Sequence, residues 1–264
     1  MNQLINYTLH LADNTLVLAQ RNSEWCAHGP ILEQDIAITN ISLDLIGQSR
    51  NFYQYAAQLI NENTLASSSS DKVYSGSTGA KGEVTEDSLA YIRTEREFKN
   101  CLLVELPNGD WGQTILRQFF FSVYQYLLYE QMQNSSDVQL SAIAEKSIKE
   151  VTYHVRWSSE WLIRLGDGTE ESRQRMLKAI DYLWMYTGEL FIPASFELIM
   201  NIDHEIVKEK WMDKIKCVFE EATLPVPDGT YMQSGGKEGK HTEHLGFVLA
   251  DLQYLQRTYP GAEW

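Results

Sequence analysis

Apolar residues recur at steps of three and four positions along most of the chain, which is the period of an amphipathic helix. In residues 3–24 they are Leu4, Ile5, Leu9, Leu11, Leu16 and Leu18, with one five-residue step. The same period predicts further helices over residues 31–60, 86–105, 113–133, 138–165, 171–191, 203–222 and 242–258. No alternation typical of a β-hairpin stands out, so the pattern predicts an all-α helical bundle.

The predicted helices are separated by short polar segments such as PNGDWG and GDGTEES. One longer interruption, ASSSSDKVYSGSTGAKGE at residues 66–83, is rich in Ser and Gly and has few apolar side chains. That composition predicts a flexible surface loop. Since the helices on either side are expected to pack together, we predict a single domain over residues 1–264.

The charge balance excludes some partners. Lys and Arg number 22 and Asp and Glu 36, a formal net charge of -14. Nucleic acids and anionic membrane surfaces attract clustered positive charge, so neither is an expected partner. Three cysteines without a CxxC motif indicate a reducing compartment. Without a signal-peptide pattern or a long apolar run, we expect a soluble cytoplasmic protein.

A metal site is the main chemical question, because EVTYHVR places Glu150 four residues before His154. Both side chains fall on one helix face. A di-iron bundle, however, needs a Glu from each of two helices and a Glu-x-x-His pair from each of two others. Of the 6 histidines only His241 follows a Glu by three positions, and it lies in a Gly-rich segment. The sequence therefore predicts no complete di-iron site.

Two interpretations of these residues remain. Glu150 and His154 form either a hydrogen-bonded polar pair inside the bundle or the remnant of a metal site. Asp44, between two leucines in an apolar helix, is either part of a solvated face or a vestigial carboxylate of the same kind.

Two further segments have more than one interpretation. TEREFKN, residues 94–100, is either an exposed helix turn or, with Arg93, Arg96 and Lys99, a source of positive charge for an anionic cofactor tail. GGKEGKHTEHLG, residues 235–246, offers His241, Glu243 and His244 as metal ligands. It also suits a helix start with Thr242 as N-cap and Glu243 in the first turn, or a loop that contacts a partner.

Four long blocks resemble the C subunits of bacterial phenylacetyl-CoA epoxidase (phenylacetate-CoA oxygenase) complexes, and the resemblance covers nearly the whole chain. The blocks are RNSEWCAHGPILEQDIAITNISLDLIGQSRNFYQYA, YIRTEREFKNCLLVELPNGDW, EVTYHVRWSSEWLIRLGDGT and GGKEGKHTEHLGFVLADLQYLQRTYPGAEW. The departure lies at about residues 65–85, where the family typically has a shorter connection.

The resemblance implies a ferritin-like helical fold and a place in an oxygenase complex. In this family the C subunit pairs with a related A subunit, whose di-iron centre inserts an oxygen atom into the aromatic ring of phenylacetyl-CoA. A reductase supplies electrons, and a small B subunit bridges the assembly. The C subunit is a structural partner, so the resemblance implies no catalytic residues and no cofactor in this chain. Asp44, Glu150 and His154 would then be vestiges.

The resemblance also implies where this chain approaches the CoA ester. One segment comprises Glu97, Phe98, Lys99 and Asn100, and the other comprises Leu198, Ile199 and Met200. Lys99 would meet a phosphate or a carbonyl, while Phe98 and Met200 would line the acyl-pantetheine path.

Two other functions stay open at this point. The first is an autonomous ferritin-like metalloenzyme that uses Asp44, Glu150, His154 and a further carboxylate. The second is a helical interaction module that never touches the substrate. The sequence does not determine the stoichiometry, the interface helices or the exact aryl-CoA.

Overall fold

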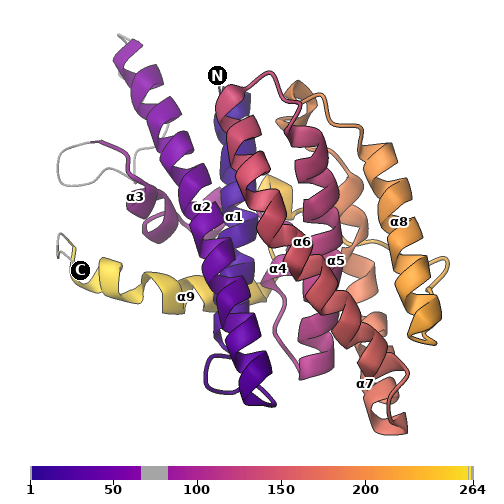
Figure 1. The fold of residues 1–264 in the computed structure, drawn as a ribbon. Helices are drawn as coiled ribbons and strands as arrows, with labels where there is room; N and C mark the ends of the chain where they lie inside the picture. The colour runs from indigo at the N-terminus through magenta and orange to yellow at the C-terminus, as the bar shows by residue number, and fades with distance from the viewer. Residues whose placement is uncertain (1, 67–82, 261, 263–264) are drawn as a thin grey trace.

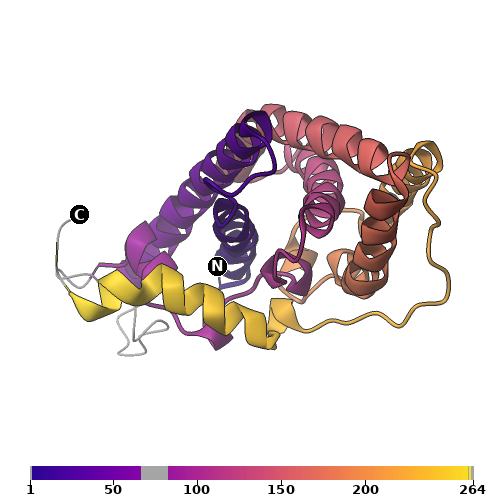
Figure 2. The same cartoon turned by 90° about the horizontal axis from the view of Figure 1, so that it is seen from below.

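Four long helices form the centre of the protein. The structure is a computed structural model that describes residues 2–66, 83–260 and 262. The four helices are α1 (Asn2–Ser23), α2 (Leu32–Ala66), α5 (Trp111–Met132) and α6 (Val138–Gly166). Helices α2 and α6 make one layer and α1 and α5 the other, as Figures 1 and 2 show. Helix α1 packs along α2, and α5 packs along α6. The predicted all-α, ferritin-like bundle is confirmed.

The remaining helices cover the two sides of this bundle. Helices α7 (Glu170–Leu183) and α8 (His204–Glu221) pack on α5, while α3 (Glu86–Tyr91), α4 (Leu102–Glu105) and α9 (Glu243–Thr258) gather on the side of α1. Five 3-10 turns connect them: η1 (Glu95–Glu97), η2 (Trp184–Tyr186), η3 (Gly188–Phe191), η4 (Glu197–Ile199) and η5 (Gly236–Glu238). The described residues contain no β-strand.

Aromatic side chains hold α8 and the 3-10 turn after α7 against α5. The ring of Phe120 lies 5.7 Å from Trp184, 5.5 Å from Trp211 and 6.1 Å from Phe219, measured between centroids. All four side chains are buried. Since burying one large apolar side chain contributes roughly 1.5–3 kcal/mol, this cluster stabilises the whole flank.

Each of the five C-terminal helices begins at a side-chain N-cap. Asp110, Asp137, Thr169, Asp203 and Thr242 each accept a hydrogen bond from a backbone N–H in the first turn. Such a cap is worth about 1 kcal/mol. The N-cap interpretation of Thr242, with Glu243 in the first turn, is confirmed.

Six of the eight predicted helices have the expected position, although α2 continues to Ala66. Two predictions are wrong in part. The helix over residues 171–191 ends at Leu183 and continues as 3-10 turns, and residues 86–105 are α3, η1 and α4 with extended backbone between them. Most of the loop predicted at residues 66–83 lies outside the described residues. None of the described helices combines the length and apolar character that crossing a membrane requires.

Candidate functional site

The extended segment 98–102 is held by side chains from elsewhere in the chain. The amides of Lys99, Cys101 and Leu102 donate to Asp13, Asn14 and Glu189 at 2.8, 2.8 and 2.7 Å. The carbonyls of Phe98 and Lys99 accept from His241 Nε2 and His10 Nδ1 at 3.0 and 2.6 Å. Because these backbone groups have side-chain partners, the segment has no need of helical hydrogen bonds. This explains why the predicted helix over 86–105 is interrupted.

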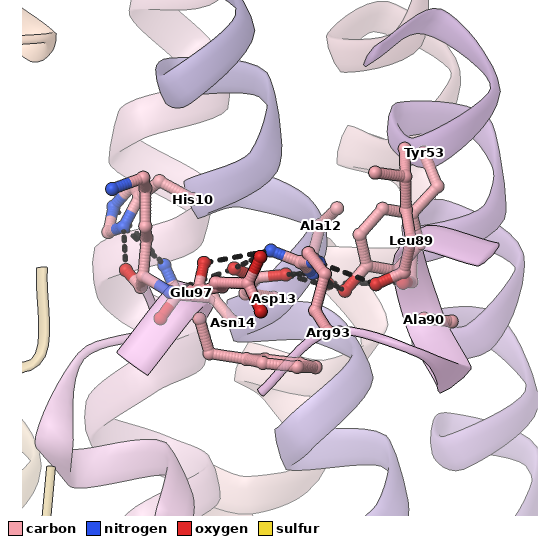
Figure 3. Close-up of polar contacts among 12 residues, drawn as sticks. His10, Ala12, Asp13, Asn14, Tyr53, Leu89, Ala90, Arg93 and Glu97 are labelled. Carbon is pink, nitrogen blue, oxygen red and sulfur yellow. Dashed lines mark hydrogen bonds and ion pairs between the residues drawn. The ribbon is translucent and has the colours of Figure 1, made fainter. Parts of the chain in front are cut away.

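Three of these partners come from one face of α1. His10, Asp13 and Asn14 stand at positions i, i+3 and i+4, so they project together, as Figure 3 shows. All three are buried. None of them was expected from the sequence, although a His, an Asp and an Asn within five residues, interleaved with Leu11 and Ala12, were the available signal.

Arg93 forms a buried ion pair with Asp13. Its guanidinium donates to both carboxylate oxygens of Asp13 and to Tyr53 Oη, and both charged side chains are fully buried. Figure 3 shows Arg93, Asp13 and Tyr53 pointing toward one another. The guanidinium carbon also lies 4.2 Å from the centroid of the Phe98 ring. Arg93 is therefore committed to the core and does not supply charge to an anionic cofactor tail.

Lys99 reaches toward the surface from this segment. Its Nζ lies 5.6 Å from the centroid of the Phe196 ring, a cation–π contact. Burial lowers the pKa of Lys99, an effect that Asp13 opposes and Arg93 reinforces. No carboxylate of the described residues lies within 4.0 Å of its ammonium group, so the charge is not neutralised by an ion pair within that part of the chain.

The second segment, residues 198–200, directly follows the buried Glu197 and lies next to the first. The two are joined through His10, whose Nδ1 donates to the Lys99 carbonyl while Nε2 lies 3.8 Å from Glu197 Oε1. Beyond the buried Glu197, Leu198 and Ile199 are 70% and 44% exposed. The two segments selected from the sequence are thus brought together in the folded chain.

The individual residues of these segments differ in accessibility. Phe98 and Asn100 are fully buried, and the Asn100 amide donates to Glu105 Oε2 at 2.8 Å. Glu97 turns back to accept from the amide and hydroxyl of Thr94, each at 2.7 Å. The accessible part of the two segments is therefore the exposed Leu198 and Ile199 together with the partly exposed Glu97, Lys99 and Met200.

Residues 234–242, here called the strap, run between the two segments and α9. Gly236 and Gly239 lie close against the backbone of residues 96–100. A Cβ at Gly236 would stand 2.3 Å from the Asn100 carbonyl oxygen, and a Cβ at Gly239 would stand 2.4 Å from the Arg96 carbonyl oxygen. Gly239 also has φ +77°, which favours glycine. His241 bonds Glu105 and the Phe98 carbonyl through its two ring nitrogens. These bonds leave no ring nitrogen for the metal-ligand interpretation of this segment.

Asp44, Glu150 and His154 lie together where α2 crosses α6. His154 Nε2 is 3.0 Å from Asp44 Oδ2, and Gln48 Nε2 donates to Glu150 Oε2 at 2.8 Å. Glu150 and His154 therefore each bond to α2, not to each other as the polar-pair interpretation proposed. Gln48 in turn accepts from Gln125 and Tyr129 of α5, at 3.0 and 3.3 Å. This ladder of hydrogen bonds joins three of the four central helices.

The residues at this crossing do not fit a di-iron centre. Among the described residues no group of three or more His, Cys, Asp or Glu side chains is placed to hold a metal ion. The groups that follow Glu150 in the hydrogen-bond network are neutral amides and not further carboxylates, since Gln48 bonds Glu150 and Gln125 bonds Gln48.

Comparisons with known proteins agree with the resemblance that the four sequence blocks show. A family model described as "Phenylacetic acid catabolic protein" matches residues 1–264. The chain is 45% identical, over 269 aligned residues, to the C subunit of the 1,2-phenylacetyl-CoA epoxidase of Escherichia coli (strain K12). That alignment covers 100% of both chains. The chain therefore belongs to the phenylacetic acid catabolic protein family.

Proposed function

We propose that this chain is a C-type subunit of a phenylacetyl-CoA epoxidase complex, in which it supports a di-iron catalytic A subunit and has no catalytic centre of its own. The observation that carries the proposal is the 45% identity to the C subunit of the Escherichia coli epoxidase over the full length of both chains. A B subunit and a reductase complete the proposed complex, which acts in aerobic phenylacetate catabolism.

The structural part of the proposal is supported by the crossing of α2 and α6. Buried glutamines take the place of ligands there, and each acidic or imidazole group already has a hydrogen-bond partner. Such a network fixes the register of helices without requiring a metal. An autonomous metalloenzyme would need carboxylates where these amides lie.

An exposed apolar stripe on α2 supports the subunit role. Leu32, Ile36, Leu43 and Ile46 share one helix face and are 72%, 51%, 60% and 43% exposed. At 1.5 Å per residue the stripe is about 21 Å long. Obligate subunit interfaces are large and apolar, and such stripes are unusual on monomers. We propose that this face contacts the catalytic subunit.

The Lys99 region is the proposed contact with the CoA ester. Its ammonium group has no ion-pair partner among the described residues and lies 5.6 Å from the centroid of the ring of Phe196, which shortly precedes the exposed Leu198 and Ile199 in the chain. This combination matches a ligand that carries phosphates and an apolar acyl-pantetheine arm. The same proposed contact includes Glu97, Phe98 and Asn100. Phe98 and Asn100 are buried, so they would support the contact surface from below.

Co-expression with the candidate catalytic subunit tests the proposal. We expect the two chains to co-purify, with stoichiometric iron in the complex and negligible iron in this chain after anaerobic Fe(II) loading and desalting. Leu43→Glu should abolish co-purification because it places a charge within the apolar stripe, whereas Ile206→Glu, on the distant α8, should not. Iron near two atoms per isolated chain would instead support an autonomous metalloenzyme.

Lys99→Met in the reconstituted complex should raise KM for phenylacetyl-CoA while kcat changes little. Loss of one hydrogen bond to a charged phosphate is worth about 1.5 kcal/mol, which is about tenfold in affinity. The measurement is steady-state turnover against substrate concentration, with Lys216→Met on the surface of α8 as the control. An unchanged KM would indicate an interaction module that never touches the substrate.

A further inference from the structure

We propose that the strap, residues 234–242, fixes the position of the two CoA-contact segments relative to each other, with Lys237 and His241 as its positioning residues. The inference rests on the proposed function, because it concerns how the same contact surface is held. The segment given this role is the one whose Gly, Lys and His residues suggested a metal site or a partner loop.

Lys237 attaches the strap to the second segment. The side chain is 4% exposed, and its Nζ donates to Glu197 Oε2 at 2.8 Å and to the Ile192 carbonyl at 2.9 Å. The same carboxylate oxygen accepts from the Ala194 amide at 2.7 Å. One buried ammonium thus closes the turn over residues 192–197, from which Leu198, Ile199 and Met200 continue.

His241 attaches the strap to the first segment. Its Nε2 lies 3.0 Å from the Phe98 carbonyl and its Nδ1 lies 2.8 Å from Glu105 Oε2. The Phe98 carbonyl only accepts, so Nε2 donates to it, and an ionised Glu105 likewise accepts from Nδ1; these two acceptors favour the protonated imidazole. The other Glu105 oxygen accepts from the Thr242 amide and hydroxyl at 2.6 and 2.7 Å. The carbonyl held by His241 directly precedes Lys99.

Between these two attachments the strap lies flat against the first segment. Glu189 bonds both, since its Oε1 accepts from the Gly235 amide and its Oε2 from the Leu102 amide, each at 2.7 Å. The close approach of Gly236 and Gly239 leaves no room for a side chain. The other contacts between these regions are longer: the Lys99 ammonium lies 5.6 Å from the ring centroid of Phe196, and Nε2 of His10 in α1 lies 3.8 Å from Glu197 Oε1. The strap is therefore their main hydrogen-bonded connection.

The protonated state of His241 makes this connection sensitive to pH. Burial lowers the pKa of His241, but the hydrogen bond and charge of Glu105 in α4, the Phe98 carbonyl and Asp13 in α1 outweigh burial and raise it overall. Among the cations, Arg21 of α1 donates to the carbonyls of Glu105 and His244, and Arg93 lies against the Phe98 ring. Because the pKa of His241 is higher in the folded than in the unfolded chain, its protonation stabilises the folded chain fully at pH values below the unfolded pKa of about 6.5. This stabilisation is lost as the pH rises through the folded-state pKa. The first segment should loosen on the alkaline side.

Hydrogen exchange of the isolated full-length chain tests the two attachments without any partner. His241→Phe should speed exchange in peptides covering residues 96–102, and Lys237→Met should do so in peptides covering 192–200. Lys240→Met, an exposed lysine of the same strap, is the matched control and should change neither. If a variant fails to fold, hydrogen exchange of the wild-type chain measured as a function of pH still tests the role of His241. After correction for intrinsic rates, residues 96–102 should lose protection as pH rises, and constant protection would overturn the role of His241.

Turnover by the reconstituted complex tests the coupling. Each variant should raise KM for phenylacetyl-CoA about tenfold with kcat little changed, within the ~10²-fold that a 1 Å misplacement can cost. Because both act through one strap, the double variant should be little worse than either single one. Strictly additive effects, or an unchanged KM in an active complex, would overturn the inference. A complex that does not form or turn over would contradict the proposed function instead, whatever the exchange data show.

Discussion

Replacing Asp13 with Asn should lower the free energy of unfolding by about 3–5 kcal/mol, because it leaves the Arg93 guanidinium buried without its counter-charge. The carboxylate of Asp13 accepts from Arg93, from Tyr53 Oη at 2.5 Å and from the Lys99 amide at 2.8 Å. The side chains of Asp13 and Arg93 are both completely buried. An Asn amide can retain one or two of these bonds but supplies no negative charge.

Urea denaturation at equilibrium measures the change, with the slope compared between variant and wild type. Asp213→Asn, the same replacement at an exposed position of α8, is the control and should have little effect. A loss of less than about 1 kcal/mol for Asp13→Asn would show that water reaches Arg93, as at surface ion pairs. Residues 98–102 would then be held less firmly than their contacts indicate, since Asp13 binds the Lys99 amide in the same cluster.

The bundle could be predicted from the sequence because its helices are long and bury a periodic face. The prediction of one helix over residues 86–105 failed for a physical reason. Their apolar spacing is helical, but His10, Asp13, Asn14 and Glu189 capture the backbone groups that a helix would need. Those four side chains lie between 86 and 89 positions away from the groups they bind, so no local pattern reports them. Tertiary contacts overrode propensity there.

The candidate site, like the fold, could be predicted from the sequence only in part. Spacing alone predicted that the histidines do not complete a di-iron set, and in the structure Glu150 accepts from the amide of Gln48, which in turn bonds Gln125. Burial of Phe98 was not predictable, because TEREFKN has the composition of a solvated turn. The strap was visible as an unusual segment, but its role depends on backbone approach at Gly236, which only the folded chain displays.

The buried charges divide into two groups with different consequences. Asp13 and Arg93 attach the first segment to α1, so they affect the stability of the core. Glu105, His241 and Lys237 attach the strap, so they affect the position of the segments that we propose to contact the substrate. A substitution in the second group should therefore alter both stability and the behaviour of the contact surface. Glu105 offers the clearest case, because its carboxylate connects α4 to both the strap and the first residues of α9.

Glu105→Gln should lower the free energy of unfolding by about 1–3 kcal/mol near pH 6, since it removes the charged acceptor that keeps the buried His241 imidazole protonated and leaves buried polar groups without their partner. Both side chains are fully buried in the wild type, 2.8 Å apart. The Gln side chain also loses one acceptor for the Asn100 amide or for Thr242. Toward pH 9 the penalty should shrink, because the pH then rises through the raised pKa of His241 and the wild type loses its charged pair as well.

Urea denaturation at these two pH values measures the difference between variant and wild type. Glu130→Gln is the matched control, because Glu130 pairs with Lys210 at 3.1 Å on the surface and should contribute at most about 1 kcal/mol. The sign of the pH dependence separates two explanations. A penalty that is equal at both pH values would mean that Glu105 acts through its neutral hydrogen bonds alone, and His241 would then hold the Phe98 carbonyl as an uncharged ring. A penalty that falls with rising pH would mean that the charged Glu105–His241 pair is required. The hydrogen bond from the strap to the segment around Lys99 would then depend on the protonation of His241.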